Sequence, residues 1–143
     1  MKTTTYIVLS FCLALSSCNT TPKPVVYGED GCHFCKMTIV DKQHATQFIT
    51  KKGRTYSFDA MECMLNHLKE TDVQSVDKFL TNDYNEPGVF IDATQASYLI
   101  SENIPSPMGE FLTAFKDGKA TAKAQSENDG EVLTWKQLRE RFK

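Results

Sequence analysis

Three sulfur-bearing side chains lie close together in the segment Cys32-His33-Phe34-Cys35-Lys36-Met37. Two cysteines separated by two residues can hold one metal ion or close a disulfide, and Met37 adds a thioether two residues later. Thiolate and thioether sulfur are the ligands that cuprous copper, Cu(I), prefers in proteins. The spacing therefore favours a Cu(I) site built on Cys32, Cys35 and Met37.

Other kinds of site could use the same cysteines. Zinc prefers four ligands, and a small zinc-knuckle interaction module could take them from three cysteines and one histidine, namely Cys32, Cys35 and Cys63 with His33 or His67. A thiol–disulfide oxidoreductase would use the CxxC pair, whose first cysteine normally opens a helix that lowers the thiol pKa. Here residues 37–40 favour a strand after the motif, which argues against that function. A purely structural Cys32–Cys35 disulfide is the remaining alternative.

A second group of candidates lies further along the chain. Met108 stands between a proline and a glycine in a constrained loop, where it is either a hydrophobic plug or an adaptable sulfur ligand. Cys63 and His67 are four residues apart on an expected helix and so share one face. Cys63 is either a small core residue or a metal ligand. His67 and His44 are either solvated side chains or imidazole ligands.

The N-terminus predicts where the protein acts. Residues 1–17 combine one basic residue with a short apolar stretch and end in Leu-Ser-Ser, directly before Cys18. This sequence resembles a bacterial lipobox, which implies a lipoprotein signal peptide and lipidation of Cys18; a plain secretory signal is the alternative. Residues 18–27 are polar and predict a flexible tether. We therefore expect an extracytoplasmic protein, lipid-anchored to a bacterial membrane on its periplasmic side or at the cell surface.

Composition limits the functional classes. The chain has 143 residues, of which 41% are hydrophobic and 24% charged, as expected for one ordinary domain. Its formal net charge of −2 and pI near 5.9 argue against a nucleic-acid-binding surface. From Cys18 onward 15 basic residues face 18 acidic ones, so a lipid rather than charge must hold the protein on its membrane. Without a serine nucleophile elbow, a phosphate loop or paired carboxylates, the sequence predicts a binding protein rather than an enzyme.

Turn and capping signals predict an α+β fold over residues 28–143. Strands are expected at 47–50 and 55–58 around a hairpin turn, and Asp59 with Glu62 predicts a capping box for a helix that ends near Lys69. A strand start is also expected at 37–40. Further strands are expected at 76–84, 89–91, 97–100, 119–125 and 131–133, with a turn at 85–88. Thr134 and Gln137 predict a second capping box, which opens a helix to about residue 142.

The two halves of the chain resemble each other. Residues 53–58 align without a gap on residues 130–135, and each segment gives a turn, a strand, a hydroxyl residue and an aromatic residue before a capped helix. This repeat predicts two small, similar ββα-type units packed together, approximately residues 28–70 and 88–143. Met37 and Met108 would then occupy corresponding places.

In their order, these motifs resemble the NosL family, copper-binding accessory lipoproteins of nitrous oxide reductase. The resemblance covers nearly all of the chain after the signal peptide. It rests on the lipobox, on Cys32-His33-Phe34-Cys35-Lys36-Met37, on Tyr56-Ser57-Phe58-Asp59 with Cys63, on Ile91-Asp92-Ala93 with Ala96-Ser97-Tyr98, and on Ser106-Pro107-Met108-Gly109 with Phe115.

The resemblance implies two similar α+β units related to a domain of organomercurial lyases, a relation that also raises a carbon–mercury lyase as a rival function. It implies a chaperone that delivers Cu(I) to the copper–sulfide centre of nitrous oxide reductase or to another copper acceptor. Cys35, Met37 and Met108 match the family's ligands, whereas Cys32 matches only members with paired cysteines. The family's mixed sulfur and imidazole ligands leave the imidazole open among His33, His44 and His67.

Overall fold

The structure is a computed structural model, which describes residues 20–143. The predicted signal peptide at residues 1–17 and the predicted lipidation site Cys18 lie outside the described residues. Within residues 20–143, the helices are all too short and too polar to span a bilayer.

A four-stranded antiparallel sheet occupies the first half of the chain, in the order β2-β1-β3-β4. Its strands are β1 (Thr46–Thr50), β2 (Thr55–Phe58), β3 (Val76–Asp83) and β4 (Glu86–Asp92). The tight turn between β1 and β2 is closed by the Thr50 N–H, which donates to the Arg54 carbonyl over 2.9 Å, and Gly53 supplies its positive φ of 81°. In register, Thr46 pairs with Phe58 at one end of this hairpin and Ile49 with Thr55 at the other.

The first helix, α1 (Met61–Leu68), follows β2 and leads through a short 3-10 turn, η1 (Val73–Ser75), into β3. Its apolar face is buried as the sequence predicts. The predicted capping box is wrong, because the helix begins at Met61 with Ala60 as N-cap and no side chain caps it. Asp59 is instead buried beneath the loop that carries Cys32, where its backbone N–H donates to the Cys32 sulfur.

The second half forms a three-stranded antiparallel sheet in the order β6-β5-β7, from β5 (Ser97–Ile100), β6 (Leu112–Phe115) and β7 (Glu131–Thr134). Two helices, α2 (Gly118–Asn128) and α3 (Trp135–Arg141), complete it. The predicted capping box of Thr134 and Gln137 at α3 is confirmed. The predicted strand at 119–125 is wrong, because this segment lies in α2.

The reason for the error at 119–125 is local. Alternating alanine and polar residues imitate a strand pattern, but alanine, lysine and glutamine are strong helix formers. Asp117 caps α2 by accepting a hydrogen bond from the Ala120 N–H over 2.8 Å. The two buried side chains of α2, Thr121 and Ala124, are three residues apart, as on one face of a helix.

Three other predicted boundaries differ from the structure. The expected strand start at 37–40 reduces to one isolated bridge between Gly31 and Thr38, so the segment around the CxxC motif is a loop. The turn expected at 85–88 is shorter, because β4 already begins at Glu86. The four-stranded sheet takes in the chain as far as Asp92, so the division near residue 88 falls inside β4.

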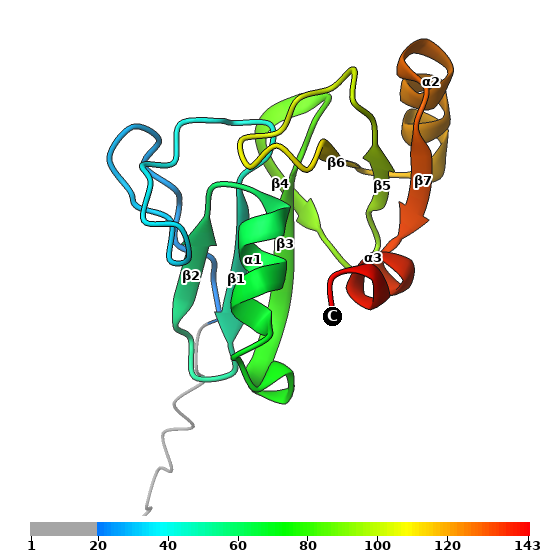
Figure 1. The fold of residues 1–143 in the computed structure, drawn as a ribbon. Coiled ribbons are helices and arrows are strands. Elements are labelled where there is room, and N and C mark those ends of the chain that lie inside the picture. Colours follow the sequence, from blue (N-terminus) through cyan, green and yellow to red (C-terminus); the bar gives the residue numbers. More distant parts are fainter. Residues whose placement is uncertain (1–19) are drawn as a thin grey trace, which may run out of the picture.

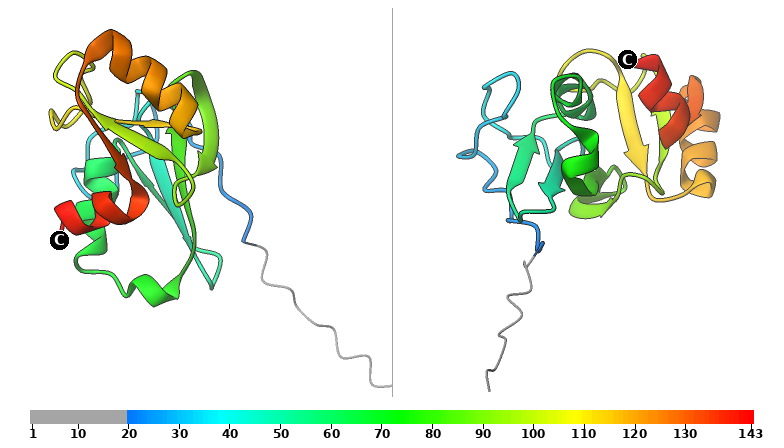
Figure 2. Two further views of the ribbon diagram at one scale, coloured as in Figure 1. Left: turned by 90° about the vertical axis from the view of Figure 1, so that its right-hand side faces the viewer. Right: turned by 90° about the horizontal axis from the view of Figure 1, so that it is seen from below.

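The two sheets share one hydrophobic core. Helix α1 packs on β1 and β2 and also contacts β6, and α2 covers β5, β6 and β7 (Figures 1 and 2). One core cluster joins buried side chains of both sheets and of α1 and α3, among them Phe48, Phe58, Met64, Tyr98, Leu112, Leu133 and Leu138. Helix α1 therefore lies against elements of both halves.

Candidate metal centre

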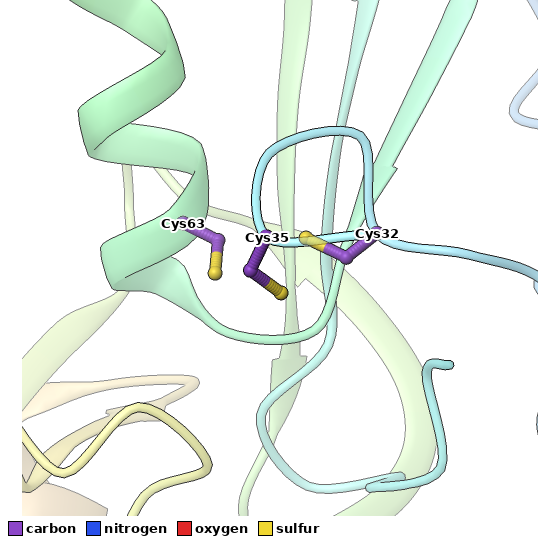
Figure 3. Close-up of side chains that lie close together, drawn as sticks. All are labelled: Cys32, Cys35 and Cys63. Carbon is purple, nitrogen blue, oxygen red and sulfur yellow. The ribbon is translucent and has the colours of Figure 1, made fainter. Parts of the chain in front are cut away.

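Three thiols from two separate segments meet at the N-terminal end of α1. The sulfur atoms of Cys32, Cys35 and Cys63 all lie within 4.8 Å of one another, and all three cysteines are free (Figure 3). Cys32 and Cys63 are buried, whereas Cys35 is partly exposed. In this part of the chain the sulfur atoms form a compact site with one accessible edge.

The loop that carries Cys32 and Cys35 is a closed turn. The Cys32 N–H donates to the Met37 carbonyl over 2.8 Å, and the Lys36 N–H donates to the Cys32 carbonyl over 3.1 Å. Lys36 makes the reversal with a φ of 67°, a conformation that non-glycine residues seldom adopt. The His33 N–H donates to the Ser57 carbonyl over 2.9 Å and so fixes the turn to β2. Both cysteines are thereby directed toward α1.

Cys63 is supplied by the first turn of α1 and is fully buried. The chain reaches it only five residues after β2 ends at Phe58, beside the strand to which the CxxC turn is fixed. The thiol of Cys63 thus completes the group from the helix side (Figure 3). From sequence alone Cys63 could equally be a core residue, and its proximity to the CxxC pair is the finding that the structure adds.

Hydrogen bonds and burial shift the pKa values of the three thiols in different directions. The Cys63 thiol donates to the Cys32 sulfur and lowers the pKa of Cys32 well below its usual range, with further help from backbone N–H groups. The same hydrogen bond and burial raise the pKa of Cys63. Burial also raises the pKa of Cys35. Of the three thiols, Cys32 is therefore the one whose ionised form its surroundings favour.

A buried carboxyl group, Glu62, lies next to Cys63 in the chain. Its Oε1 accepts a 2.6 Å hydrogen bond from the Ser106 hydroxyl, while its buried Oε2 has no hydrogen-bond partner. Burial raises the pKa of Glu62. From the sequence, Glu62 is expected only as part of a capping box. The signal available was its position inside an apolar stretch, Met61 to Leu65, where a carboxylate needs a specific partner.

The bond between Ser106 and Glu62 positions the loop that carries Met108. Ser106 lies two residues before Met108, so the loop is held against the first turn of α1, and Figure 1 shows it in yellow beside that end of the helix. The side chain of Met108 is 36% exposed and that of Met37 is 47% exposed. The structure thus brings the Met108 loop to the same end of α1 as the thiols, with both thioethers at the surface.

The three histidines have different surroundings. Both ring nitrogens of His44 are engaged, Nδ1 with Asp41 at 3.0 Å and Nε2 with Thr113 at 3.2 Å, so this side chain connects the two halves of the fold. His33 places Nδ1 against the backbone of Ser57. His67 packs among aromatic rings, and burial lowers its pKa. In the described part of the chain, the group of mutually close ligand atoms contains sulfur and no imidazole nitrogen.

A model of the protein family described as NosL matches residues 24–142. The chain belongs to the NosL family. Among solved structures, the NosL member is similar in fold to the crystal structure of the copper chaperone NosL from Shewanella denitrificans, with a TM-score of 0.72 and 18% sequence identity. The match covers 83% of this chain and 96% of the other. A search of the curated proteins found no match. The predicted α+β NosL fold is therefore confirmed.

Proposed function

We propose that this NosL protein is a chaperone that binds Cu(I) through the sulfur atoms of Cys32, Cys35 and Cys63. The observation that carries the proposal is the convergence of three free thiols within 4.8 Å, two buried and one partly exposed. Membership of the NosL family and the fold of a named copper chaperone support it. Met37 and Met108, at the surface of the same region, are the thioethers that would close the site.

The chemistry of the ligands favours Cu(I) over zinc. Soft thiolate and thioether sulfur suits Cu(I), which accepts low coordination numbers, whereas structural zinc sites take four thiolate or imidazole ligands. The group formed by residues 20–143 provides three thiols and no histidine. A zinc knuckle completed by His33 or His67 would require a rearrangement of the His33 turn or of the aromatic cluster around His67.

The partial exposure of Cys35 would allow Cu(I) to be transferred to an acceptor protein. A ligand of an acceptor protein can reach copper from the side of Cys35, because Cys32 and Cys63 are buried. Stepwise exchange would then move the ion without leaving it free. We propose the copper–sulfide centre of nitrous oxide reductase as the destination, with another extracytoplasmic copper protein as the alternative. The protein would act outside the cytosol, held to the membrane by a lipid on Cys18.

One observation favours a second function, a thiol–disulfide oxidoreductase. The lowered pKa of Cys32 gives the CxxC pair a thiolate at neutral pH, as such enzymes require. Against it, Cys32 is only 2% exposed, so a substrate disulfide cannot reach its sulfur. The motif also lies in a turn followed by an isolated bridge, not at a helix N-terminus.

An anaerobic titration of the reduced protein with Cu(I), in competition with a chromophoric chelator, tests the proposal. Cys63→Ser should weaken binding by at least about tenfold, since even outer-shell changes at metal sites cost that much. Met108→Leu should weaken it less, and Met64→Leu, a change at a fully buried core methionine, serves as the matched control. If Cys63→Ser binds as tightly as Met64→Leu, the three-thiol site is wrong. Insulin reduction that survives Cys63→Ser would instead support the oxidoreductase.

A further inference from the structure

The segment that leads to the membrane anchor is bound along the body of the protein. Residues 20–27 have no regular secondary structure, but Val25 and Tyr27 pack against the core cluster. The Gln47 side chain donates to the Lys23 carbonyl over 2.7 Å. The Lys78 ammonium donates to the Thr20 carbonyl over 3.1 Å. The tether expected at residues 18–27 is therefore held in place from Thr20 onward.

These contacts define the end of the molecule at which the chain departs. Lys78 pairs in register with Ile49, and Ile49 pairs with Thr55, so Thr20 lies level with the β1–β2 turn. The Lys51 N–H donates to the Ser75 carbonyl over 2.8 Å, which places η1 at the same level. We call residues 20–21, 51–54 and 69–78 the hairpin end. Figure 1 shows the β1–β2 turn and η1 at the bottom of the molecule.

The thiol cluster lies at the opposite end of the same sheet. Cys32 and Cys35 are fixed beside Ser57, and Cys63 is in the first turn of α1, whereas the hairpin end begins just after the last turn of that helix. From Cys63 to Lys69 the chain advances six residues along α1, a length of about 9 Å. In Figure 1, α1 runs from its N-terminal end, at the top, to η1 below.

Charge is distributed unevenly between the two ends. The hairpin end has five basic residues against three acidic ones, a formal charge of +2. The remainder of residues 20–143 has ten basic residues against fifteen acidic ones, a formal charge of −5. Lys51, Lys52 and Arg54 are all exposed at the turn itself. The basic surface of an acidic protein thus coincides with the point where the chain departs.

From this arrangement we propose that the hairpin end lies on the membrane and binds anionic phospholipid headgroups, while the thiol cluster faces the aqueous phase. The inference rests on the proposed lipid anchor at Cys18. Cys18 precedes Thr20 by two residues, so the anchor lies within about 7 Å of a bound point on the body. So short a connection prevents the protein from turning over on the membrane. The basic side chains add a favourable interaction, about fivefold in binding for each cation near an anionic surface.

This orientation restricts the partner. An acceptor must approach Cys35 from the solvent side, with its copper ligands well above the bilayer, and not along the plane of the headgroups. A water-exposed domain with soft sulfur or imidazole ligands fits this approach.

Lysine footprinting on the full lipidated protein tests the proposal without copper. The protein is acetylated with an amine-reactive reagent in detergent and again in vesicles of phosphatidylethanolamine and phosphatidylglycerol, and modification of each lysine is measured by mass spectrometry. Lys51 and Lys52 should react at least about threefold more slowly in the vesicles, since headgroups within reach of cations bind them several-fold. Two exposed lysines away from the hairpin end should react equally in both: Lys36, next to Cys35 in the chain, and Lys42, which precedes β1 at the end of the strand opposite to the β1–β2 turn.

Charge reversal provides the matched control. The double variant Lys51→Glu, Lys52→Glu should abolish the slower acetylation of Lys69, which is exposed just after α1, whereas Lys119→Glu, Lys123→Glu, the same change in charge on α2, should preserve it. Equal reaction of Lys51 and Lys52 in detergent and vesicles would overturn the proposal, and so would slower reaction of Lys36 and Lys42. The mass of the N-terminal peptide reports lipidation. Its absence at Cys18 would refute this orientation and leave the copper site untouched.

Discussion

The hydrogen bond between Ser106 and Glu62 predicts a stability loss that depends on pH. Glu62 is 2% exposed and Oε1 is the only carboxylate oxygen that accepts from a side chain, over 2.6 Å. A hydrogen bond to a charged group contributes about 1.5–3 kcal/mol, and one to a neutral group about 0.5–1.5 kcal/mol. Ser106→Ala should therefore lower the free energy of unfolding by about 2 kcal/mol when Glu62 is ionised and by about 1 kcal/mol when it is protonated.

The raised pKa of Glu62 determines how the stability loss in Ser106→Ala changes with pH. The pKa of Glu62 is higher in the folded protein than in the unfolded chain. The stabilisation that Glu62 contributes is therefore complete at pH values below the pKa of the unfolded chain, and it is lost as the pH rises through the pKa of the folded protein. The Ser106 hydroxyl lowers the folded pKa and limits that loss. Ser106→Ala should consequently cost more at pH 8 than at pH 4.5.

Urea unfolding of the reduced protein, followed by Trp135 fluorescence at both pH values, measures this difference. At pH 8 the midpoint of thermal unfolding should also fall by about 8 °C, given some 4 °C per kcal/mol for a domain of this size. Ser126→Ala removes an exposed hydroxyl that donates to Lys123 within α2 and should change stability by less than about 0.5 kcal/mol at either pH. Equal losses for Ser106→Ala at both pH values would refute the assignment of a buried, ionisable partner.

Three further predictions concern the metal site and two local structures. Cu(I) affinity should increase between pH 6 and pH 8, because Cys35 and Cys63 have raised pKa values and must lose protons to bind; competition titrations at each pH would contradict this if affinity stayed constant. Gly130→Ala should cost more than about 2 kcal/mol in urea unfolding, because Gly130 has a φ of 112° and an added Cβ would collide with the Ile100 carbonyl. A cost no greater than that of Gly109→Ala, where space is open, would be inconsistent with this. Thr134→Ala removes the capping box of α3 and should cost about 1 kcal/mol, and thermal unfolding that is unchanged would contradict it.

Local signals in the sequence were sufficient for much of the fold. The turn at residues 51–54 and the pattern around it predicted the β1–β2 hairpin, and Thr134 with Gln137 predicted the start of α3. The segment at 119–125 could not be settled in the same way, because its alternation suits a strand and its composition suits a helix. In the structure Asp117 caps this segment as a helix, and the helix packs against β5.

The candidate site, too, could be predicted from the sequence only in part. Cys32 and Cys35 were evident from spacing alone, since a CxxC turn brings two thiols together whatever surrounds it. The place of Cys63 depends on how β2 fixes the turn and where α1 begins, and both are tertiary properties. Glu62 was assigned to a cap because its spacing from Asp59 fits one, whereas burial in the core gave it Ser106 as a partner. The ligand roles of Met37 and Met108 stay predictions.

Because the three cysteines lie in two separate parts of the chain, copper binding would depend on correct folding. Only a correctly folded copy holds Cys63 against the CxxC turn, and an unfolded copy retains two neighbouring thiols at most. A bound ion would therefore act as a cross-link between the turn and the helix and would resist unfolding in proportion to its affinity for the native state. Unfolded copies of the protein would release their copper, and only folded copies would bind it.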